Sequence, residues 1–441
     1  MTAGKPARRT PLKRFFLWRR AIDPILLTLA TATFMLPGDI AVWLFAIFGA
    51  IGLYLIAIRH RSIRRMDRRY AAATAILALS ALSIGFANGS LPEDFRWASY
   101  PAYYLAVVPL SVGVVLVRDP MRQLVIGARI GIVIVTVWSL AALASGAYRY
   151  GFGSNSANAA FAVTFLAILS RLKVSAPPRL LASGRAYFYL GLIPVLVTGT
   201  RATVTIFVAG LFIDLIGLLR GQHQLSPGGS RMALGGSLVA AAMLAGAGWL
   251  LAPTIEARVS DTVREITNLS DDPAGVRGGL SVRLVLWNCA LEVIEDHPLT
   301  GVGGLATKPA LLAKIPEEHR KRFAELSFSH NFLLDEGMQR GFLGIIVLVG
   351  FYAFTVHRIA RYGTPDIREN LALAMLLILT FGMLHYLLLV DRHVALIAIY
   401  FIVLITDNQR RRLRARWHRP APEPEPEPAL EPVANPEPAF R

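Results

Sequence analysis

Two arginines and one histidine interrupt or border long apolar runs of the chain. Arg201 lies in VTGTRATVTIF, Arg283 lies near the start of SVRLVLWNCALEVIEDHPLTGVGG, and His330 lies in FSHNFLLDEGMQRGFLG. Arginine at membrane depth is energetically expensive and is usually retained for a function, and its planar guanidinium group binds phosphate oxygens bidentately. An uncharged imidazole beside a bound anion can act as a general base. These residue types predict a site that binds a phosphate-bearing anion and transfers a proton.

The segment around Arg201 predicts a turn at the membrane boundary. Only Gly199, Thr200 and Arg201 separate two apolar segments, and the first of these segments is short for a complete span. We therefore expect a hairpin or a broken helix that dips into the outer leaflet, with the guanidinium group at the level of a lipid phosphate. The structural alternative is an arginine that snorkels from a helix end toward water.

A helix is expected around Arg283, because apolar residues recur at helical spacing up to the HPLTGVGG segment. This apolar stripe consists of Leu284, Trp287, Leu291 and Ile294. Arg283 and Trp287 are four residues apart and therefore share one side of the helix. We expect the stripe to pack against the membrane surface, with Trp287 as an interfacial anchor, and the glycines at 301–304 to form a tight turn.

His330 precedes a helix that leads into a membrane span. Ser327 or Ser329 is expected to cap this helix. That cap would place His330 in the first turn, where the positive helix end favours an anion and an uncharged imidazole. The alternative is that His330 is a capping or packing residue. Asn331, the next residue, is a candidate neighbour of the site.

Asp391, Arg392 and His393 occupy the last expected outer loop, from which they can reach the same region. An Asp–Arg pair that neutralises itself is the simpler interpretation of the first two. The outer segments contain no His-Glu helix motif, no clustered His and Cys ligands and no DxD motif, and Cys289 is the one cysteine of the chain. We therefore expect neither a metal site nor a cofactor.

The elements that must position these residues are membrane helices. Of the 441 residues, 54% are hydrophobic and 17% are charged, whereas a soluble protein has roughly a quarter charged residues. This composition predicts an all-α polytopic membrane protein and excludes a soluble enzyme, a secreted disulfide scaffold and a nucleic-acid binder. Because a span needs about 20 residues, we expect about twelve transmembrane helices. They are predicted at 21–37, 40–58, 70–88, 99–117, 123–144, 156–172, 186–200, 202–219, 232–252, 340–357, 369–390 and 393–407.

The distribution of lysine and arginine predicts the orientation. With the N-terminus inside, the inner segments contain about thirty of the 46 lysines and arginines, and the short outer loops contain about four, as the positive-inside rule requires. The expected organisation, in chain order, is a basic cytoplasmic N-terminus at 1–20, nine spans within 21–252, a large helical periplasmic loop region at 253–339, three spans within 340–407, and a disordered, Pro/Glu-rich cytoplasmic tail at 408–441.

Taken together, the three motifs resemble the bacterial O-antigen ligase and polymerase superfamily. The segments that carry the resemblance are TGTRAT at 198–203, the R-x-x-x-W run that ends in HPLTGVGG at 283–304, and SHNFLLDEGMQRGFLG at 329–344. The expected number of spans and the large loop before the last few spans are also similar to that family. The resemblance covers most of the chain outside its two tails.

The resemblance implies a metal-independent, inverting glycosyltransferase of the GT-C class in the bacterial inner membrane. Such an enzyme moves a glycan from undecaprenyl pyrophosphate to a sugar of lipid A-core on the periplasmic face. His330 matches the family's essential loop histidine, which would accept or orient the proton of the acceptor hydroxyl. Arg201 and Arg283 match its essential arginines, which would bind the pyrophosphate. The neighbouring candidates are Trp287, Asn331, Asp391 and Arg392.

Three other functions stay open at this point. An O-antigen polymerase of the same superfamily would use the same donor with a second lipid-linked glycan as acceptor, and short motifs do not separate the two. A peptidoglycan-type polymerase has a similar outline, but the outer loops show no paired acidic site. A transporter or flippase for an anionic lipid or sugar would need polar residues along a path through the membrane, whereas the notable arginines gather at the outer face.

Overall fold

The computed structural model describes residues 11–89, 99–147, 149–220, 260, 279–326 and 328–417. Within these ranges the regular elements are helices and no strand is present, which confirms the all-α prediction. The α-helices are α1 (Pro11–Ala32), α2 (Ile40–Ala57), α3 (Arg68–Ala87), α5 (Ser99–Val114), α6 (Pro120–Ala144), α7 (Ser156–Arg171), α8 (Gly184–Leu190), α9 (Leu192–Thr198), α10 (Val204–Leu219), α12 (Gly279–Asp296), α13 (Gly304–Lys314), α14 (Glu317–Phe323), α15 (Phe332–Tyr362), α16 (Pro365–Gly382) and α17 (Asp391–Trp417). Short 3-10 helices are η1 (Arg61–Arg65), η3 (Arg179–Leu181), η4 (Arg201–Thr203) and η6 (Leu387–Leu389).

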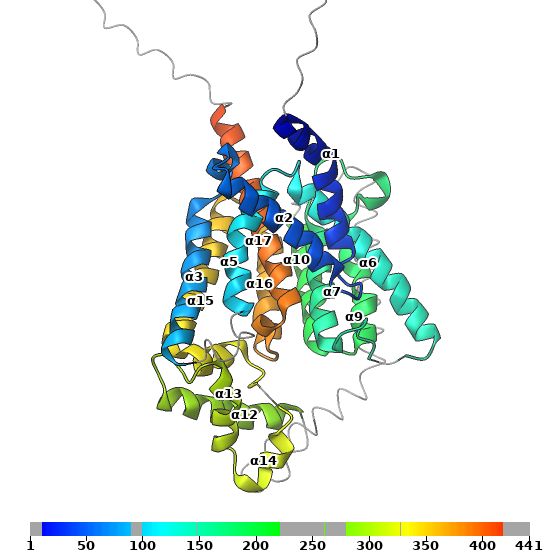
Figure 1. The fold of residues 1–441 in the computed structure, drawn as a ribbon. Coiled ribbons are helices and arrows are strands. Elements are labelled where there is room, and N and C mark those ends of the chain that lie inside the picture. The colour runs from blue at the N-terminus through cyan, green and yellow to red at the C-terminus, as the bar shows by residue number, and fades with distance from the viewer. Residues whose placement is uncertain are drawn as a thin grey trace, which may run out of the picture.

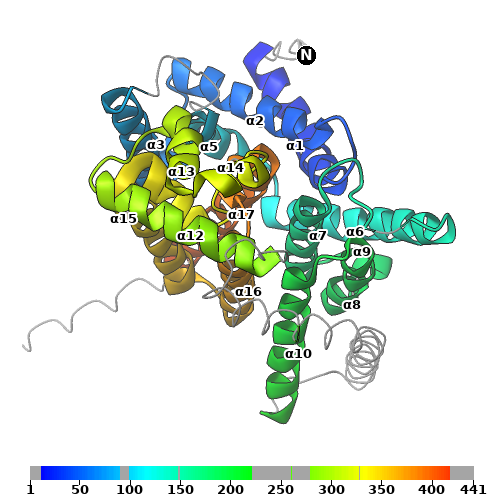
Figure 2. The same cartoon turned by 90° about the horizontal axis from the view of Figure 1, so that it is seen from below.

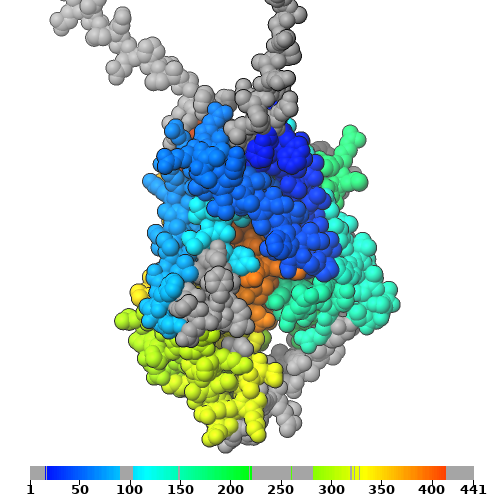
Figure 3. Space-filling view, viewed as in Figure 1, coloured from blue at the N-terminus to red at the C-terminus, as the bar shows by residue number. Residues whose placement is uncertain are grey.

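The long helices form a bundle, with the beginning of α1 and the end of α17 at one end and α12 to α14 at the other (Figure 1). In the space-filling view, α12 to α14 form a yellow-green cap below the bundle (Figure 3). The cap has a small apolar core of its own, which α15 joins through Met338. This core consists of Leu286, Cys289, Ala290, Val293, Ile294, Leu311, Ile315, Phe323 and Met338. The cap is therefore attached to the bundle mainly through α15.

Helix α7 lies at the centre of the bundle. All of its residues from Ala159 to Arg171 are buried, as expected for a helix that is apolar on every side. Its neighbours include α6, α8, α9 and α16, with which it makes its largest interhelical contacts. The last helix, α17, is buried along most of its apolar length between Val394 and Ile405. These two helices form the core against which the others pack.

Four of the described helices, α2, α3, α6 and α15, are long and apolar enough to cross a membrane. Shorter apolar helices lie at Tyr103–Val114, Ser156–Arg171 and Gly184–Thr198. The chain is thus a membrane protein built of helices, but the predicted count of twelve spans is not confirmed. The predicted span at 232–252 lies outside the described residues, and the predicted domain boundaries and sides of the membrane stay predictions.

The seventh apolar segment is short and ends in a turn at Gly199, where its sequence predicts one. Helices α8 and α9 have seven residues each and meet at Gly191, where a Cβ would lie 2.8 Å from the Cβ of Ala167 in α7. After α9 the chain turns at Gly199, whose φ of 69° lies in the left-handed region, and η4 then leads into α10. The turn that carries Arg201 is therefore tight, and glycine permits it.

Two helices near the cap differ from the predicted spans. Helix α16 ends at Gly382 rather than near residue 390, and residues 383–390 form a turn with η6. Helix α15 begins at Phe332, before the predicted position 340, and is interrupted at Gly341, where φ is 64° and ψ is −164°. Hydropathy did not locate the end of α16, because residues 383–390 are nearly as apolar as the helix. It placed the start of the span at 340 because Asp335, Glu336 and Arg340 make the first turns of α15 polar.

Candidate active site

His330 lies in the link that leads into α15, one residue before the helix cap. The N-cap residue is Asn331, whose side chain accepts hydrogen bonds from the amides of Leu333 at 3.0 Å and Leu334 at 3.3 Å. The prediction that a serine caps this helix and that His330 lies in its first turn was wrong, because Asn331 satisfies those amides from a position closer to the helix. Ser327 lies outside the described residues.

Neighbouring hydrogen bonds hold the backbone of His330 in an unusual conformation. Its φ of 59° lies in the left-handed region, which costs a residue with a Cβ atom about 1–3 kcal/mol. The amide and the hydroxyl of Ser329 both donate to Oδ1 of Asp335 at 2.8 Å, and Asp335 is 3% exposed. The link is thereby closed onto the first turn of α15, and the direction of the His330 side chain is restricted.

Helix α12 holds the same link from the other side. Nε1 of Trp287 donates a hydrogen bond of 3.0 Å to the carbonyl oxygen of Ser329. The indole predicted to be an interfacial anchor thus has a partner inside the protein. The contact of the predicted apolar stripe with the membrane surface stays a prediction. Within the structure Leu291 is 48% exposed, whereas Leu286 and Ala290 are buried. The reason is that α12 packs against α13 and α15.

The glycine-containing turn after α12 joins α12 to α15. Four backbone hydrogen bonds of 2.7–3.3 Å connect residues 298–303 with residues 338–343, on both sides of the kink at Gly341. A Cβ on Gly301 would lie 2.4 Å from the carbonyl oxygen of Met338, and a Cβ on Gly341 would lie 2.3 Å from the backbone of Leu299. Both glycines also have positive φ. The HPLTGVGG motif therefore fixes the helix of the candidate arginine against the helix that follows the candidate histidine.

Burial and a nearby cation keep His330 uncharged. The pKa of His330 lies below its ordinary value, chiefly because the imidazole is partly buried and further because Arg283 is close. Burial also lowers the pKa of Arg283, but a guanidinium group stays cationic in proteins. Nδ1 of His330 is buried and has no hydrogen-bond partner among the described residues. The sequence predicted an uncharged imidazole because of the positive end of a helix. In the structure, burial and Arg283 lower the pKa of His330 instead.

The sequence analysis missed two aromatic residues at this site. His385 and Tyr386 lie in the turn after α16, with ring centroids 6.5 Å and 5.7 Å from that of His330. Burial, chiefly, together with interactions with Arg283 and His330 lowers the pKa of His385 to about 4. Both residues were placed inside the predicted span at 369–390. The sequence signal that could have identified them is the occurrence of histidine and tyrosine side by side within an apolar run.

Arg201 is the first residue of η4, and its side chain is exposed. The short helix η4 packs against α7 and α16. Arg149 lies beside the same turn, because a Cβ on Gly199 would be 3.2 Å from its Cγ. The structure records no hydrogen bond or ion pair between Arg201 and either Arg283 or His330, both of which are described. The convergence of Arg201 on the other site residues therefore stays a prediction.

Figure 2 shows α12 crossing the lower face of the bundle from α15 toward α7. This course carries the beginning of α12, where Arg283 lies, toward the interior of that face. The residues that the described contacts bring together are Arg283, Trp287, His330, Asn331, His385 and Tyr386. The arrangement can bind an anion through a guanidinium group and offer an uncharged imidazole as a proton acceptor.

The residues at 391–393 do not form the predicted self-neutralising pair. Nε of Arg392 lies 2.5 Å from Oδ1 of Asp39, in the link between α1 and α2. His393 is 1% exposed, and its Nε2 lies 3.2 Å from the carbonyl oxygen of Asn158. Asp391 and Arg392 are adjacent at the start of α17, and successive residues of a helix do not face each other. The pair inferred from adjacency was therefore wrong.

In the part of the chain that the structure describes, no three His, Cys, Asp or Glu side chains lie close enough together to hold a metal ion.

The comparison with curated proteins gave no match. The family model described as O-antigen ligase matches residues 186–349. The matched segment begins in α8, ends in α15 and contains all three motifs. Residues 186–349 of this membrane protein, which contain Arg201, Arg283 and His330, are thus similar to the O-antigen ligase family.

Proposed function

We propose that the protein is an O-antigen ligase of the bacterial inner membrane. It would transfer a glycan from undecaprenyl pyrophosphate to a sugar of lipid A-core. Both substrates would be anchored among the membrane lipids. The observation that supports this most is the match of residues 186–349 to the family model. Within this segment, partial burial and the charge of Arg283 lower the pKa of His330. The distribution of lysine and arginine supports cytoplasmic termini and a site that faces the periplasm.

The proposed reaction forms one bond and breaks one bond at the anomeric carbon of the donor sugar. The acceptor hydroxyl attacks this carbon while the bond to the pyrophosphate oxygen breaks, so the configuration inverts. The hydroxyl proton passes to the imidazole of His330, and the electron pair of the broken bond stays on undecaprenyl pyrophosphate. General-base help of this kind raises a rate by about 10²–10⁴, and an uncharged histidine is ready to accept the proton.

Arg283 would stabilise the negative charge of the leaving group. More negative charge develops on the leaving oxygen in the transition state than in the ground state, so a fixed guanidinium group stabilises the transition state preferentially. Arg201 would supply a second guanidinium group from the η4 turn. We propose a metal-independent transfer without a cofactor, because these two groups can bind the pyrophosphate oxygens bidentately.

The test uses purified protein in detergent with undecaprenyl pyrophosphate-linked glycan, lipid A-core and a chelator, and measures glycan on lipid A by gel electrophoresis. We expect transfer by the wild type and a loss of about 10²–10⁴ in rate for His330→Ala. The matched control is His357→Ala, since His357 is an exposed histidine of α15 outside the three motifs. Its rate should stay within about twofold of wild type.

The same assay distinguishes the other functions. If donor glycans lengthen on their own lipid and none reaches lipid A, the protein is a polymerase of the same family. If neither product forms from demonstrably active substrates, the enzymatic proposal is rejected, and movement of the lipid-linked glycan between the leaflets of a vesicle would identify a transporter. A reaction that the chelator abolishes and Mg²⁺ restores would contradict the metal-independent mechanism.

A further inference from the structure

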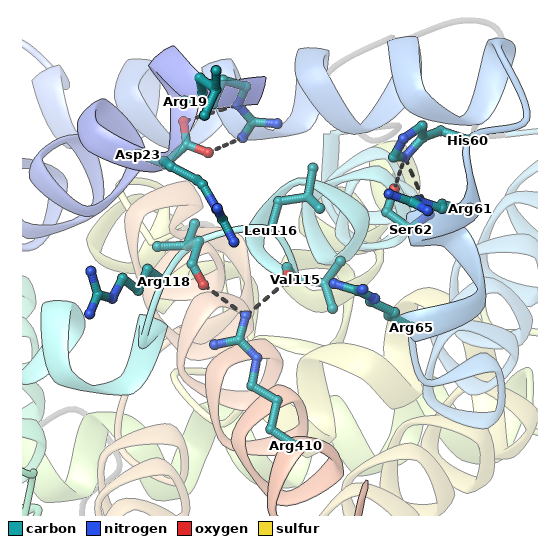
Figure 4. A pocket seen from close by; sticks show the side chains of 13 residues that line it. Arg19, Asp23, His60, Arg61, Ser62, Arg65, Val115, Leu116, Arg118 and Arg410 are labelled. Atoms are coloured by element: carbon teal, nitrogen blue, oxygen red, sulfur yellow. Dashed lines mark hydrogen bonds and ion pairs between the residues drawn. The ribbon is translucent and has the colours of Figure 1, made fainter. Parts of the chain in front are cut away.

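A cavity of about 820 Å³ opens at the end of the bundle opposite α12 to α14. Its walls come from α1, from residues 60–65 in and before η1, from the link between α5 and α6, and from α17 (Figure 4). Six arginines line it: Arg19, Arg20, Arg61, Arg65, Arg118 and Arg410. The carboxylate in the lining is that of Asp23. Such an excess of positive charge attracts anions.

Asp23 leaves the charge of the cavity largely uncompensated, because Arg19 already pairs with it. Nε of Arg19 donates to Oδ1 of Asp23 at 3.0 Å, and Nη2 lies 2.5 Å from Oδ2. Arg19 is 2% exposed, and its third nitrogen, Nη1, is buried without a hydrogen-bond partner in the described ranges. In Figure 4 two nitrogens of this guanidinium group face Asp23 and the third points away from it. A buried donor without a partner is unfavourable, and Arg19 is part of the cavity lining.

The other arginines of the cavity differ in how many hydrogen bonds their side chains make. Nη2 of Arg410 donates to the carbonyl oxygens of Val115 at 2.8 Å and Val117 at 2.7 Å, which joins α17 to the link between α5 and α6 (Figure 4). Arg65 and Arg118 are exposed, and no ion pair or hydrogen bond of their side chains occurs within the described structure. These two guanidinium groups are available to a ligand.

The field of these charges acts on His60, which lines the same cavity. Burial lowers the pKa of His60, and the charges of Arg61 and Arg65 lower it further. The histidine therefore adds no charge at neutral pH but can donate or accept a hydrogen bond. Leu17 and Leu116 supply apolar surface in the lining. The cavity thus combines an apolar edge with several cationic donors.

We propose that this cavity binds an anion with phosphate groups, either the headgroup of an anionic phospholipid or a free pyrophosphate-like ion. Guanidinium groups match phosphate oxygens in geometry as well as in charge. The volume of about 820 Å³ lies within the range of roughly 300–1,000 Å³ that ligand sites occupy, and basic pockets between membrane helices hold lipid headgroups in other proteins. This inference does not depend on the proposed transfer reaction.

The experiment uses the purified, delipidated full chain in an uncharged detergent. Cardiolipin, phosphatidylethanolamine and inorganic pyrophosphate are titrated separately, with binding followed by native mass spectrometry and by the melting temperature Tm. The test variant is Arg65→Gln/Arg118→Gln. Its matched control is Arg64→Gln/Arg69→Gln, which removes two exposed arginines outside the lining. The Tm of each variant without ligand reports whether it folds.

We expect an anionic probe to raise the Tm of the wild type and of the control, and the test variant to bind it about tenfold or more weakly. Binding of cardiolipin alone identifies a lipid headgroup, and equal binding of pyrophosphate identifies a free anion. Equal affinities of test variant and wild type would overturn the proposal, as would equal binding of phosphatidylethanolamine.

Discussion

The two ends of the bundle carry positive charge in different ways. At the α12 to α14 end, one partly buried arginine, Arg283, lies beside uncharged histidines. The residues on both sides of His330 are held there by hydrogen bonds from α12 and α15. At the opposite end six arginines surround one cavity, and several of them are exposed. The candidate site therefore places one arginine near a histidine whose flanking backbone is held by hydrogen bonds. The cavity at the other end gathers six arginines, several of them exposed.

This difference indicates what each end is suited to do. A fixed charge distinguishes a transition state from a ground state, because its position matches only one of them. Many adaptable charges raise the local concentration of anions and bind them with little geometric demand. Substitutions at the α12 to α14 end should therefore change the rate of transfer, and substitutions at the other end should change the affinity for an anion.

The largest contrast is expected between Arg283→Gln and Arg65→Gln. Loss of Arg283 would remove the proposed donor to the leaving group and should lower kcat by about 10²–10³. Loss of Arg65 changes an exposed residue at the far end and should leave kcat within about twofold. Transfer to lipid A-core at saturating donor measures both. If kcat fell by similar factors in the two variants, the proposed difference in function between the two ends of the bundle would be wrong.

A smaller effect is expected from Trp287→Phe. The phenyl ring keeps the packing of α12 but cannot donate to the carbonyl oxygen of Ser329, so the link with His330 is held less firmly. One hydrogen bond contributes about 0.5–1.5 kcal/mol, which corresponds to a roughly threefold to tenfold lower kcat. The KM for the donor should not change. A change in KM with an unchanged kcat would show that Trp287 contacts substrate and does not position His330.

The pH dependence gives a third comparison. The proposed mechanism requires uncharged His330, so the rate should rise as the pH increases through its pKa and become constant above it. This pKa lies below the ordinary value of 6.5, chiefly through burial and also through Arg283, so the acidic limb lies below pH 6.5. Arg283→Gln should move the limb to higher pH, whereas Arg65→Gln should leave it in place. The measurement is kcat/KM against pH, and an unchanged limb in Arg283→Gln would contradict the electrostatic coupling.

The smallest effect is expected from Arg392→Gln. Its ion pair with Asp39 is partly exposed, with 28% and 55% of the two side chains accessible, and such pairs contribute about 0–1 kcal/mol. The variant should lower the free energy of unfolding by no more than that and keep transfer within about twofold. A loss of transfer as large as that of Arg283→Gln would extend the catalytic end to residues 391–393.

Much of the candidate site was predictable from residue types, and the part that was not depends on contacts between distant segments. Arg283 and His330 border apolar runs, and the break around Arg201 followed from glycine next to a short segment. The cap at Asn331, the contact of His385 with His330 and the pairing of Arg392 with Asp39 were missed. Arg392 and Asp39 are 353 residues apart, and no local pattern encodes such a contact.

The sequence by itself determined that the chain is helical and apolar, where most helices lie, and which motifs could carry chemistry. These features follow from composition and from periodicity along a few turns, which depend on neighbouring residues only. The tertiary structure decided which side chains meet. It brought His385 beside His330 by ending α16 early, fixed α12 against the kink of α15, and gathered arginines from four separate segments around one cavity. Packing sets these arrangements, because burial and hydrogen-bond partners depend on the positions of whole helices.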